Sequence, residues 1–391
     1  MRRPDDPLPG APDPWVGSTM PPVRPGPPYL MTEMIEAEPA FAERVLRRLL
    51  ADGGAAERLA QAVRATVEAG RDVVVVGCGT SEHGAMAAAA ILSHTARSAS
   101  GAGRIVARQA LEAALAPQDA GLLVGISHEG GTWATNEALA AARGAQTLTA
   151  LITVSERSPG AALADIVVTT DEADQSWCHT VGYLSPILAA AAVGALEQGA
   201  TLDVAAVRAV LAAGVAQAAA AGSMAGGLGS VDRLLVVASG SDRPAARELA
   251  LKVEEASYLP TVARDLETIL HGHLPATGAT TGLVLILTDR ERRADRAHRA
   301  RGVLEAARVL DMRAGAILAQ DVANDWPAEL TPAGRLTVPD APGLVAPAAA
   351  LIGSAVPLQW LAERLARARG TDPDTLRRTD ARYTAAAAAA E

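Results

Sequence analysis

A chain of 391 residues is too long for one ordinary domain and long enough for two of middling size. With 49% hydrophobic and 20% charged residues it is not a disordered chain, and its 3% aromatic content predicts cores built from alanine, valine and leucine. The net charge of −9, with no visible basic face, argues against a nucleic-acid partner.

The two cysteines, Cys78 and Cys178, lack the spacing of a zinc site or redox pair, so we expect a reduced, cytoplasmic protein. Behind the charged amino terminus there is no apolar stretch typical of a secretory signal. The most apolar run, 184–196, is too short to span a membrane and contains Pro186. We therefore expect no membrane partner.

Ten of the first 28 residues are proline, which removes amide donors and favours extended backbone. We predict a disordered tail over residues 1–28. A helical pattern opens at 30–35, with Thr32 as its N-cap, and two further helical patterns follow at 40–51 and 55–69. Short β-branched runs then alternate with polar turns and helical stretches, as in a doubly wound sheet; the runs are 73–76, 122–126, 148–154 and 166–168.

The same alternation begins again in the second half, with strand-like runs at 234–238, 283–287 and 314–318. The sequence therefore predicts two tandem, doubly wound α-β-α sandwich domains with parallel sheets. We expect the helical amino-terminal segment and first domain over 29–221, and the second domain with a carboxy-terminal tail over 222–391. The glycines of 221–227 interrupt the helical pattern and mark the boundary.

Two turns of the first half, 77–81 and 127–132, carry glycine and hydroxyl side chains between a buried strand and a helix. Such turns suit an anionic ligand group at the carboxyl edge of the sheet, although glycine also occurs where a backbone merely bends. Neither turn has the spacing of an ATP or dinucleotide loop, and we expect no cofactor.

Lys252 is the only lysine of the chain, and Glu255 lies on the same helix face. Arginine serves elsewhere as the cation, so a lone lysine suggests hydrogen bonding or proton exchange that guanidinium cannot supply, although codon bias and a surface salt bridge are the plain alternatives. His271 and His273 stand in a loop bounded by glycine and proline. They suit acid–base work better than metal binding, because no third ligand is evident.

Three segments together resemble the tandem sugar-isomerase (SIS) domains of glucosamine-6-phosphate synthase and related deaminases over about residues 30–375: Gly77-Cys-Gly-Thr-Ser81, Ile126-Ser-His-Glu-Gly-Gly-Thr132, and Glu248–Tyr258 with His271-Gly272 downstream. The resemblance implies a sugar or sugar-phosphate substrate.

It places Ser81, Ser127 and Thr132 at the phosphate, with Gly79 and Thr80 shaping the loop. Glu255 matches the carboxylate that moves a proton between C1 and C2, and Lys252 matches a lysine of the same site. His271 matches a ring-opening histidine donated by the neighbouring subunit, which implies a homodimer.

The chain departs from that family at several binding positions. His128 and Glu129 replace Gln-Ser, and the carboxylate of Glu129 would repel a phosphate at short range unless it turns away or pairs with a cation. His179 replaces a serine and, with Trp177, either reshapes the pocket or is a plain core residue. The reactive lysine of the tail is missing, leaving only arginines such as Arg378.

The glutaminase half of the synthase is also absent from this sequence, so glutamine-dependent amination is not expected. We expect an aldose–ketose isomerase or an aminosugar-phosphate deaminase that works by enediol or enediolamine proton transfer. A deglycase acting on a ketose–amine adduct is a third enzymatic hypothesis. A sugar-binding regulatory protein without turnover is the alternative from a different class.

Overall fold

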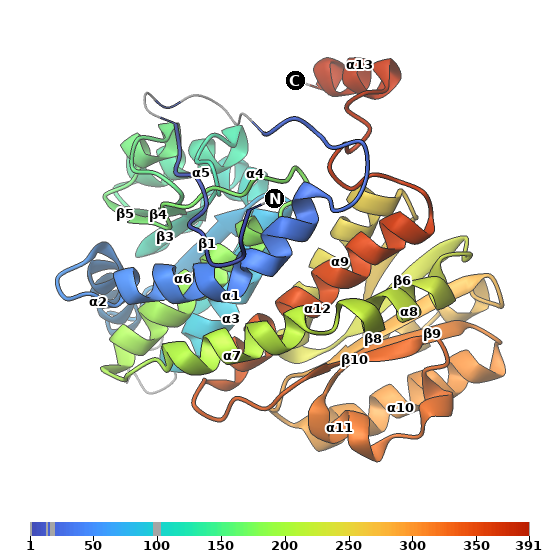
Figure 1. Ribbon diagram of the computed structural model, residues 1–391. Helices are drawn as coiled ribbons and strands as arrows, with labels where there is room; N and C mark the ends of the chain where they lie inside the picture. Colours follow the sequence, from blue (N-terminus) through green and yellow to red (C-terminus); the bar gives the residue numbers. More distant parts are fainter. Residues whose placement is uncertain (1, 13–14, 16–19, 97–102, 391) are drawn as a thin grey trace.

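A computed structural model describes residues 2–12, 15, 20–96 and 103–390, and it contains two five-stranded parallel sheets (Figure 1). The first has the order β2-β1-β3-β4-β5 and the second has the order β10-β9-β8-β6-β7. Read from β7, the second order repeats the first, which confirms two doubly wound domains of one topology. The strands are β1 (Val73–Gly77), β2 (Ile105–Gln109), β3 (Leu122–Ile126), β4 (Leu148–Thr153), β5 (Ile166–Thr169), β6 (Arg233–Ala238), β7 (Thr261–Asp265), β8 (Thr281–Leu287), β9 (Arg313–Ala319) and β10 (Gly334–Val338).

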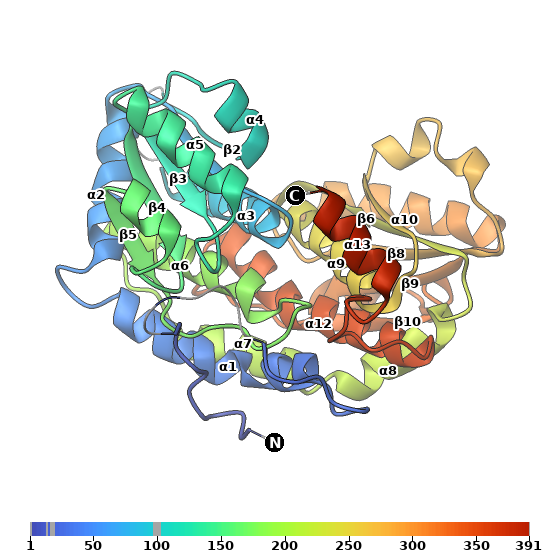
Figure 2. The same cartoon turned by 90° about the horizontal axis from the view of Figure 1, so that it is seen from above.

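Helices cover both faces of each sheet and also fill the space between the two domains (Figure 2). In the first domain these are α1 (Leu30–Leu49), α2 (Ala55–Glu68), α3 (Thr80–Thr95), α4 (Ala110–Leu115), α5 (Trp133–Gly144) and α6 (Val181–Gln198). Then come α7 (Val204–Val215), α8 (Ala218–Leu228), α9 (Arg243–Ser257), α10 (Arg293–Val309), α11 (Gln320–Asp325), α12 (Ala346–Ala368) and α13 (Ala381–Ala390).

Alternate residues of the inner strands enter different cores because side chains point to opposite faces of a strand. Val73 and Val75 join a large core that runs through α1, α3, α6, α9 and α12 and spans both domains. Val74 and Val76 face α4 and α5 instead. The shared core fixes the two domains against one another, so that residues of α9 can meet residues of the first domain.

The predicted boundary at 221/222 lies inside α8 rather than in a loop. One of the glycines there serves close packing: a Cβ on Gly227 would approach the Cα of Ala333 to 3.0 Å. A helix can therefore keep this glycine where it lies directly on the second sheet.

Helix α6 is long and apolar enough to cross a membrane, but 83% of the helix is buried inside the protein. It extends beyond the apolar run seen in the sequence and contains Pro186. Burial of this kind is typical of a central core helix.

The proline-rich segment falls partly outside the described residues. Its residues 2–12 make specific contacts that composition alone did not indicate. Leu8 is buried, and its N–H donates to Glu172 Oε2 at 2.8 Å, while the N–H of Ala173 donates to the carbonyl of Pro9 at 2.8 Å. This part of the segment lies against the carboxyl end of β5.

Candidate active site

The two glycine- and hydroxyl-rich turns follow β1 and β3, which are neighbours in the first sheet. Gly79 precedes α3 with a φ of 56°, a conformation that favours glycine, and Thr80 and Ser81 open the helix. In the second turn, the Oγ of the buried Ser127 lies 3.3 Å from Oγ1 of the exposed Thr132. Both turns lie at the carboxyl edge of the sheet, where open α/β folds bind ligands.

We expect Gly77→Ala to destabilise the protein by about 2 kcal/mol or more, because the turn has no room for a methyl group. A Cβ at Gly77 would lie 2.4 Å from the carbonyl oxygen of Ser81. Gly226→Ala in α8 is the matched control, since nothing lies within 4 Å of its Cβ position. That substitution should raise the free energy of unfolding by about 0.5–1 kcal/mol. Urea unfolding of both variants checks the pair, and equal effects would contradict it.

The corresponding turn of the second domain, after β6, is occupied by protein groups. A Cβ on Gly240 would meet the guanidinium of Arg296 at 2.4 Å, and that guanidinium pairs with Asp289 at 2.6 Å. The N–H of Ser241 donates to the same carboxylate at 2.9 Å. The two domains share a topology, but protein groups occupy the turn of the second domain. The first-domain turns are therefore the better candidate for a ligand site.

Beside this occupied turn, burial raises the pKa of Asp242 to about 6, although hydrogen bonds from Thr288 and Asp289 lower it. A carboxyl group whose pKa rises on folding stabilises the native state below its unfolded pKa of 3.8, and that contribution is lost as the pH rises through 6. We expect Asp242 to lower the free energy of unfolding by about 2–3 kcal/mol between pH 4 and pH 7. Asp242→Asn should flatten this part of the pH profile, and Asp295→Asn on the surface should not. An unchanged profile in Asp242→Asn would contradict the assignment.

Helix α9 carries three charged residues on its inner face. The fully buried ammonium of Lys252 lies 2.5 Å from Oε2 of Glu255 and 3.6 Å from Oε1 of Glu248. Glu248 is also fully buried, and the Glu255 side chain keeps 23% of its surface exposed. Of the two carboxylates around the lysine, Glu255 is thus the one that a ligand can reach.

Two residues of α3 bind the inner carboxylate from the first domain. Nδ1 of His83 lies 2.7 Å from Oε2 of Glu248, and Thr80 donates to Oε1 at 3.2 Å. The predicted turn residue Thr80 is therefore tied directly to α9. The sequence interpretation missed His83 and Glu248, although Glu248 stands four residues before Lys252, where it shares a helix face with the lysine.

The charges around Lys252 correct the expectation that this amine could exchange protons. Burial lowers its pKa, but the carboxylates of Glu255 and Glu248 outweigh burial and raise the pKa above its usual value. The pKa of Glu248 is lowered: burial opposes this, and Lys252 and His83 produce it. Lys252 therefore stays charged near neutral pH, and proton exchange by this amine is not supported.

The loop before α6 lies against the same cluster. Sγ of Cys178 is 3.6 Å from Oε2 of Glu255. The loop is held by the buried carboxylate of Asp174, which accepts the N–H groups of Ser176 at 3.0 Å, Thr180 at 2.7 Å and Gly182 at 3.0 Å. These bonds set the position of the loop that carries Trp177 and His179, a role for Asp174 that local sequence did not reveal.

His128 and Glu129 occupy the second turn with different surroundings. The Nε2 atom of His128 accepts the N–H of Asp174 at 2.9 Å, and its ring centroid is 5.5 Å from that of His179. Glu129 borders a small cavity of about 120 Å³, which Trp15 and Met20 also line. His128 thus joins the 174–182 loop, whereas Glu129 faces the amino-terminal segment.

His271 lies apart from Lys252 and Glu255 within this chain. Its side chain is 68% exposed, and Nε2 contacts Oε1 of Glu267 at 2.8 Å. Glu267 also pairs with Arg299. The structure therefore brings together the predicted lysine and carboxylate but not the predicted histidine.

The carboxy-terminal arginines stack on aromatic rings near the loop. The guanidinium of Arg378 is 3.5 Å from the ring centroid of Trp177, and Arg377 lies between the rings of Tyr258 and Tyr383. Stacking on aromatic faces is a use for which guanidinium is well suited.

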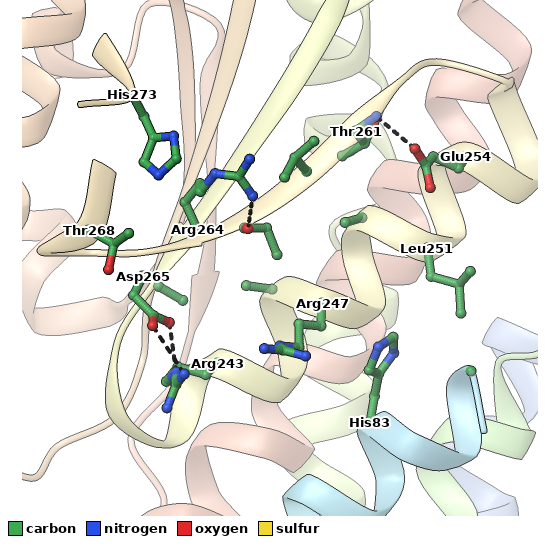
Figure 3. Close-up of a pocket in the computed structure, with 16 residues that line it drawn as sticks. His83, Arg243, Arg247, Leu251, Glu254, Thr261, Arg264, Asp265, Thr268 and His273 are labelled. Atoms are coloured by element: carbon green, nitrogen blue, oxygen red, sulfur yellow. Dashed lines mark hydrogen bonds and ion pairs between the residues drawn. The ribbon is translucent and has the colours of Figure 1, made fainter. Parts of the chain in front are cut away.

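A cleft of about 640 Å³ opens on the outer face of α9 (Figure 3). Gly79 and His83 border it from the first domain, and Arg247 and His273 border it from the second. Figure 3 shows His83 directed toward the α9 side chains that line the cleft. The cleft therefore connects the edge of the first turn with the histidine-bearing loop.

Three solved structures share this fold. The carboxy-terminal domain of glucosamine-fructose-6-phosphate aminotransferase from Francisella tularensis has a TM-score of 0.76 at 19% identity, covering 90% of this chain and 99% of that one. Tagatose-6-phosphate ketose/aldose isomerase from Escherichia coli has a TM-score of 0.69 at 19% identity, covering 92% and 97%. Glucosamine-6-phosphate deaminase from Thermotoga maritima has a TM-score of 0.58 at 16% identity, covering 85% and 97%. At such identities the likeness establishes the fold, and no curated protein matches the chain in sequence.

The family model for the SIS domain matches residues 68–208, which include both turns and the 174–182 loop. Residues 68–208 are therefore a SIS domain, and the resemblance seen in the sequence is confirmed for this part of the chain.

Proposed function

We propose that this protein is a sugar or sugar-phosphate aldose–ketose isomerase, or an aminosugar-phosphate deaminase, that works by enediol or enediolamine proton transfer. The observation that carries this proposal is the contact between Lys252 and Glu255, 2.5 Å apart on the helix that meets the first-domain turns. A solvent-accessible carboxylate beside a permanent cation is suited to taking a proton from carbon.

In the proposed reaction, Glu255 removes the proton from C2 of the open-chain sugar and returns it to C1, or the reverse. The ammonium of Lys252, 2.5 Å from Glu255, favours the negative oxygen that develops in the enediolate. The lysine itself needs no proton transfer for this role, which agrees with its raised pKa.

The substrate would bind along the first-domain turns. Ser81, Ser127 and Thr132 provide hydroxyl groups for a phosphate or another polar distal group, and Gly79 and Thr80 shape the approach. We assign His128, Glu129 and His179 to the same binding region. Both cysteines of the described chain are free, in keeping with the reduced cytoplasm in which we place this chemistry.

A homodimer that donates His271 across its interface completes the proposal. The cleft on α9 is bordered both by Gly79 and by the loop of His273. In a two-fold symmetric pair, a partner seated at this face would bring its own copy of that loop toward the Gly79 turn. The 68% exposure of the His271 side chain leaves it accessible for such a contact.

Hydrogen exchange tests the chemistry directly. In deuterium oxide the protein should introduce deuterium at C1 or C2 of its sugar, and we expect Glu255→Gln to reduce the rate at least about 100-fold because the base is removed. Glu254→Gln is the matched control: Glu254 is the adjacent residue and binds the N–H of Thr261 at 3.1 Å. Full exchange by Glu255→Gln would overturn the assignment, and release of ammonia from glucosamine 6-phosphate would separate a deaminase from an isomerase.

A sugar-binding regulatory protein is the second candidate. It is favoured by the enclosure of Lys252 between two carboxylates, since such a cluster can also serve structure alone. The missing tail lysine points the same way. Thermal stabilisation by phosphosugars without any hydrogen exchange would support this function over catalysis.

A further inference from the structure

Two imidazoles and one carboxylate form a cluster beside Glu255 that the proposed reaction has not yet used. His128 comes from the turn after β3, and Asp174 and His179 come from the loop before α6. Nδ1 of His179 lies 3.7 Å from Oδ2 of Asp174, and the two rings are 5.5 Å apart. Cys178, next to His179 in the chain, contacts Glu255 at 3.6 Å.

We propose that His179 is a catalytic acid–base group of this site, supplied by the same chain as Glu255, with Asp174 as its positioning residue. This assignment rests on the isomerase chemistry proposed above. It gives the site a proton donor for the closed sugar ring that does not depend on the distant His271.

The contacts of His128 fix its protonation state and leave its Nδ1–H free to donate to a ligand. Its Nε2 accepts the backbone N–H of Asp174 at 2.9 Å, so the proton of the neutral ring is on Nδ1. Burial and the charge of His179 lower the pKa of His128 to about 4, which keeps the ring neutral. Nδ1 is buried and has no hydrogen-bond partner among the described residues. A buried donor of this kind is suited to a sugar oxygen.

The pKa of His179 is shifted in the opposite direction. Burial lowers its pKa, but Asp174 outweighs burial and raises the pKa above the usual value. Asp174 itself stays ionised, because His179 and the N–H of Gly182 hold its pKa at about 2 against the effect of burial. Of the other charged groups acting on His179, Glu255 favours the imidazolium and Lys252 opposes it. The His179 side chain keeps 25% of its surface exposed, so a ligand can reach it.

The step that this arrangement supports is opening of the hemiacetal ring. The imidazolium of His179 gives its proton to the ring oxygen as the bond from that oxygen to the anomeric carbon breaks. The anomeric hydroxyl becomes the carbonyl, and its proton passes to solvent water, which returns a proton to the imidazole. The open-chain sugar then meets Glu255, with no net gain or loss of protons.

Fructose 6-phosphate and its 5-deoxy analogue provide the test, because the analogue lacks the hydroxyl that closes the ring. We expect His179→Asn to slow deuterium exchange into fructose 6-phosphate at least about 100-fold. Exchange into 5-deoxyfructose 6-phosphate should stay within about threefold of the unaltered protein, since the analogue needs no ring opening. His298→Asn, which removes an exposed imidazole from α10, is the control and should leave both rates unchanged.

Two results would overturn the role of His179 alone: equal slowing of both sugars, or full activity of His179→Asn on fructose 6-phosphate while His271→Asn loses it. Absence of exchange with both sugars by the unaltered protein would overturn the isomerase function together with this role. If His179→Asn does not fold, nitrogen-15 NMR of the unaltered protein decides. The imidazole of His179 should titrate at a higher pH than a free imidazole, because its pKa is raised, and its signal should move on addition of fructose 6-phosphate. A ring that titrates at a lower pH or does not respond would contradict the proposal.

Discussion

Replacing Lys252 by methionine is expected to lower the free energy of unfolding by about 3–5 kcal/mol and to abolish hydrogen exchange. The fully buried ammonium neutralises Glu255 at 2.5 Å and Glu248 at 3.6 Å. Methionine matches the length of the lysine stem but leaves both carboxylates without a cation. Removing one partner of a buried ion pair costs more than the pair itself contributes, because an uncompensated charge remains in the interior.

Two matched variants separate charge from shape at this position. Lys252→Met combined with Glu248→Gln should recover at least half of the lost stability, because the fully buried carboxylate is removed as well. Lys252→Arg keeps the charge but should still cost about 1–3 kcal/mol, since the cavity holds a fully enclosed lysine and guanidinium is larger. Urea unfolding near pH 7 measures all three. If the free energy of unfolding of Lys252→Met lies within about 1 kcal/mol of the parent value, the ion pairs of Lys252 do not hold the two domains together.

The second large effect is expected for Asp374→Ala, which should lower the free energy of unfolding by about 3 kcal/mol or more. The buried Asp374 accepts three hydrogen bonds: from the N–H of Leu30 at 2.6 Å, the N–H of Met31 at 3.0 Å and the hydroxyl of Ser176 at 3.1 Å. One carboxylate thus joins the start of α1, the loop before α6 and the carboxy-terminal segment. Its removal leaves buried donors unpaired at the start of α1 and in the loop before α6.

Because Ser176 belongs to the loop that carries Cys178 and His179, Asp374→Ala should also weaken binding of fructose 6-phosphate. Asp374→Asn keeps one acceptor oxygen and should cost less than alanine. Asp380→Ala is the surface control, because its carboxylate pairs with the exposed Arg382 at 3.3 Å. Urea unfolding and a ligand-induced shift in melting temperature measure both effects. Equal stability of Asp374→Ala and Asp380→Ala would contradict this role for Asp374.

The strands that the sequence analysis missed all lie at sheet edges, and β5 is the edge strand that it found. Val73–Val76, 122–126 and 283–287 are continuous apolar runs because central strands are buried on both faces. The strands β2, β7 and β10 were not predicted, and each lies at an edge of its sheet. Arg108, Arg264 and Arg335 interrupt their apolar pattern, as edge strands allow.

Helix α1 shows a related difference. It begins at Leu30 and runs through Pro39, whereas the sequence pattern placed a separate helix at 40–51. The helix is buried along much of its length, and packing against α6, α7 and α12 supports it across the proline.

At the candidate site, local spacing found the pairs that lie on one element. Lys252 and Glu255 meet because they stand three residues apart on α9, and Ser127 and Thr132 meet because they belong to one turn. Groups joined across elements were not predictable in this way. His83 with Glu248 and Asp374 with Leu30 link residues 165 and 344 positions apart.

The amino-acid sequence by itself determined the two-domain parallel architecture, the SIS domain of the first half, and the residue types that face the first-domain turns. These follow from short-range patterns, namely buried runs, glycine turns and helix-face spacing. Only the tertiary structure decided that Lys252 is enclosed and permanently charged, that the second-domain turn is occupied by Arg296, and that His271 lies away from Glu255 in its own chain. Burial and charge pairing depend on which distant elements pack together, and that information is set by the folded core rather than by any local segment.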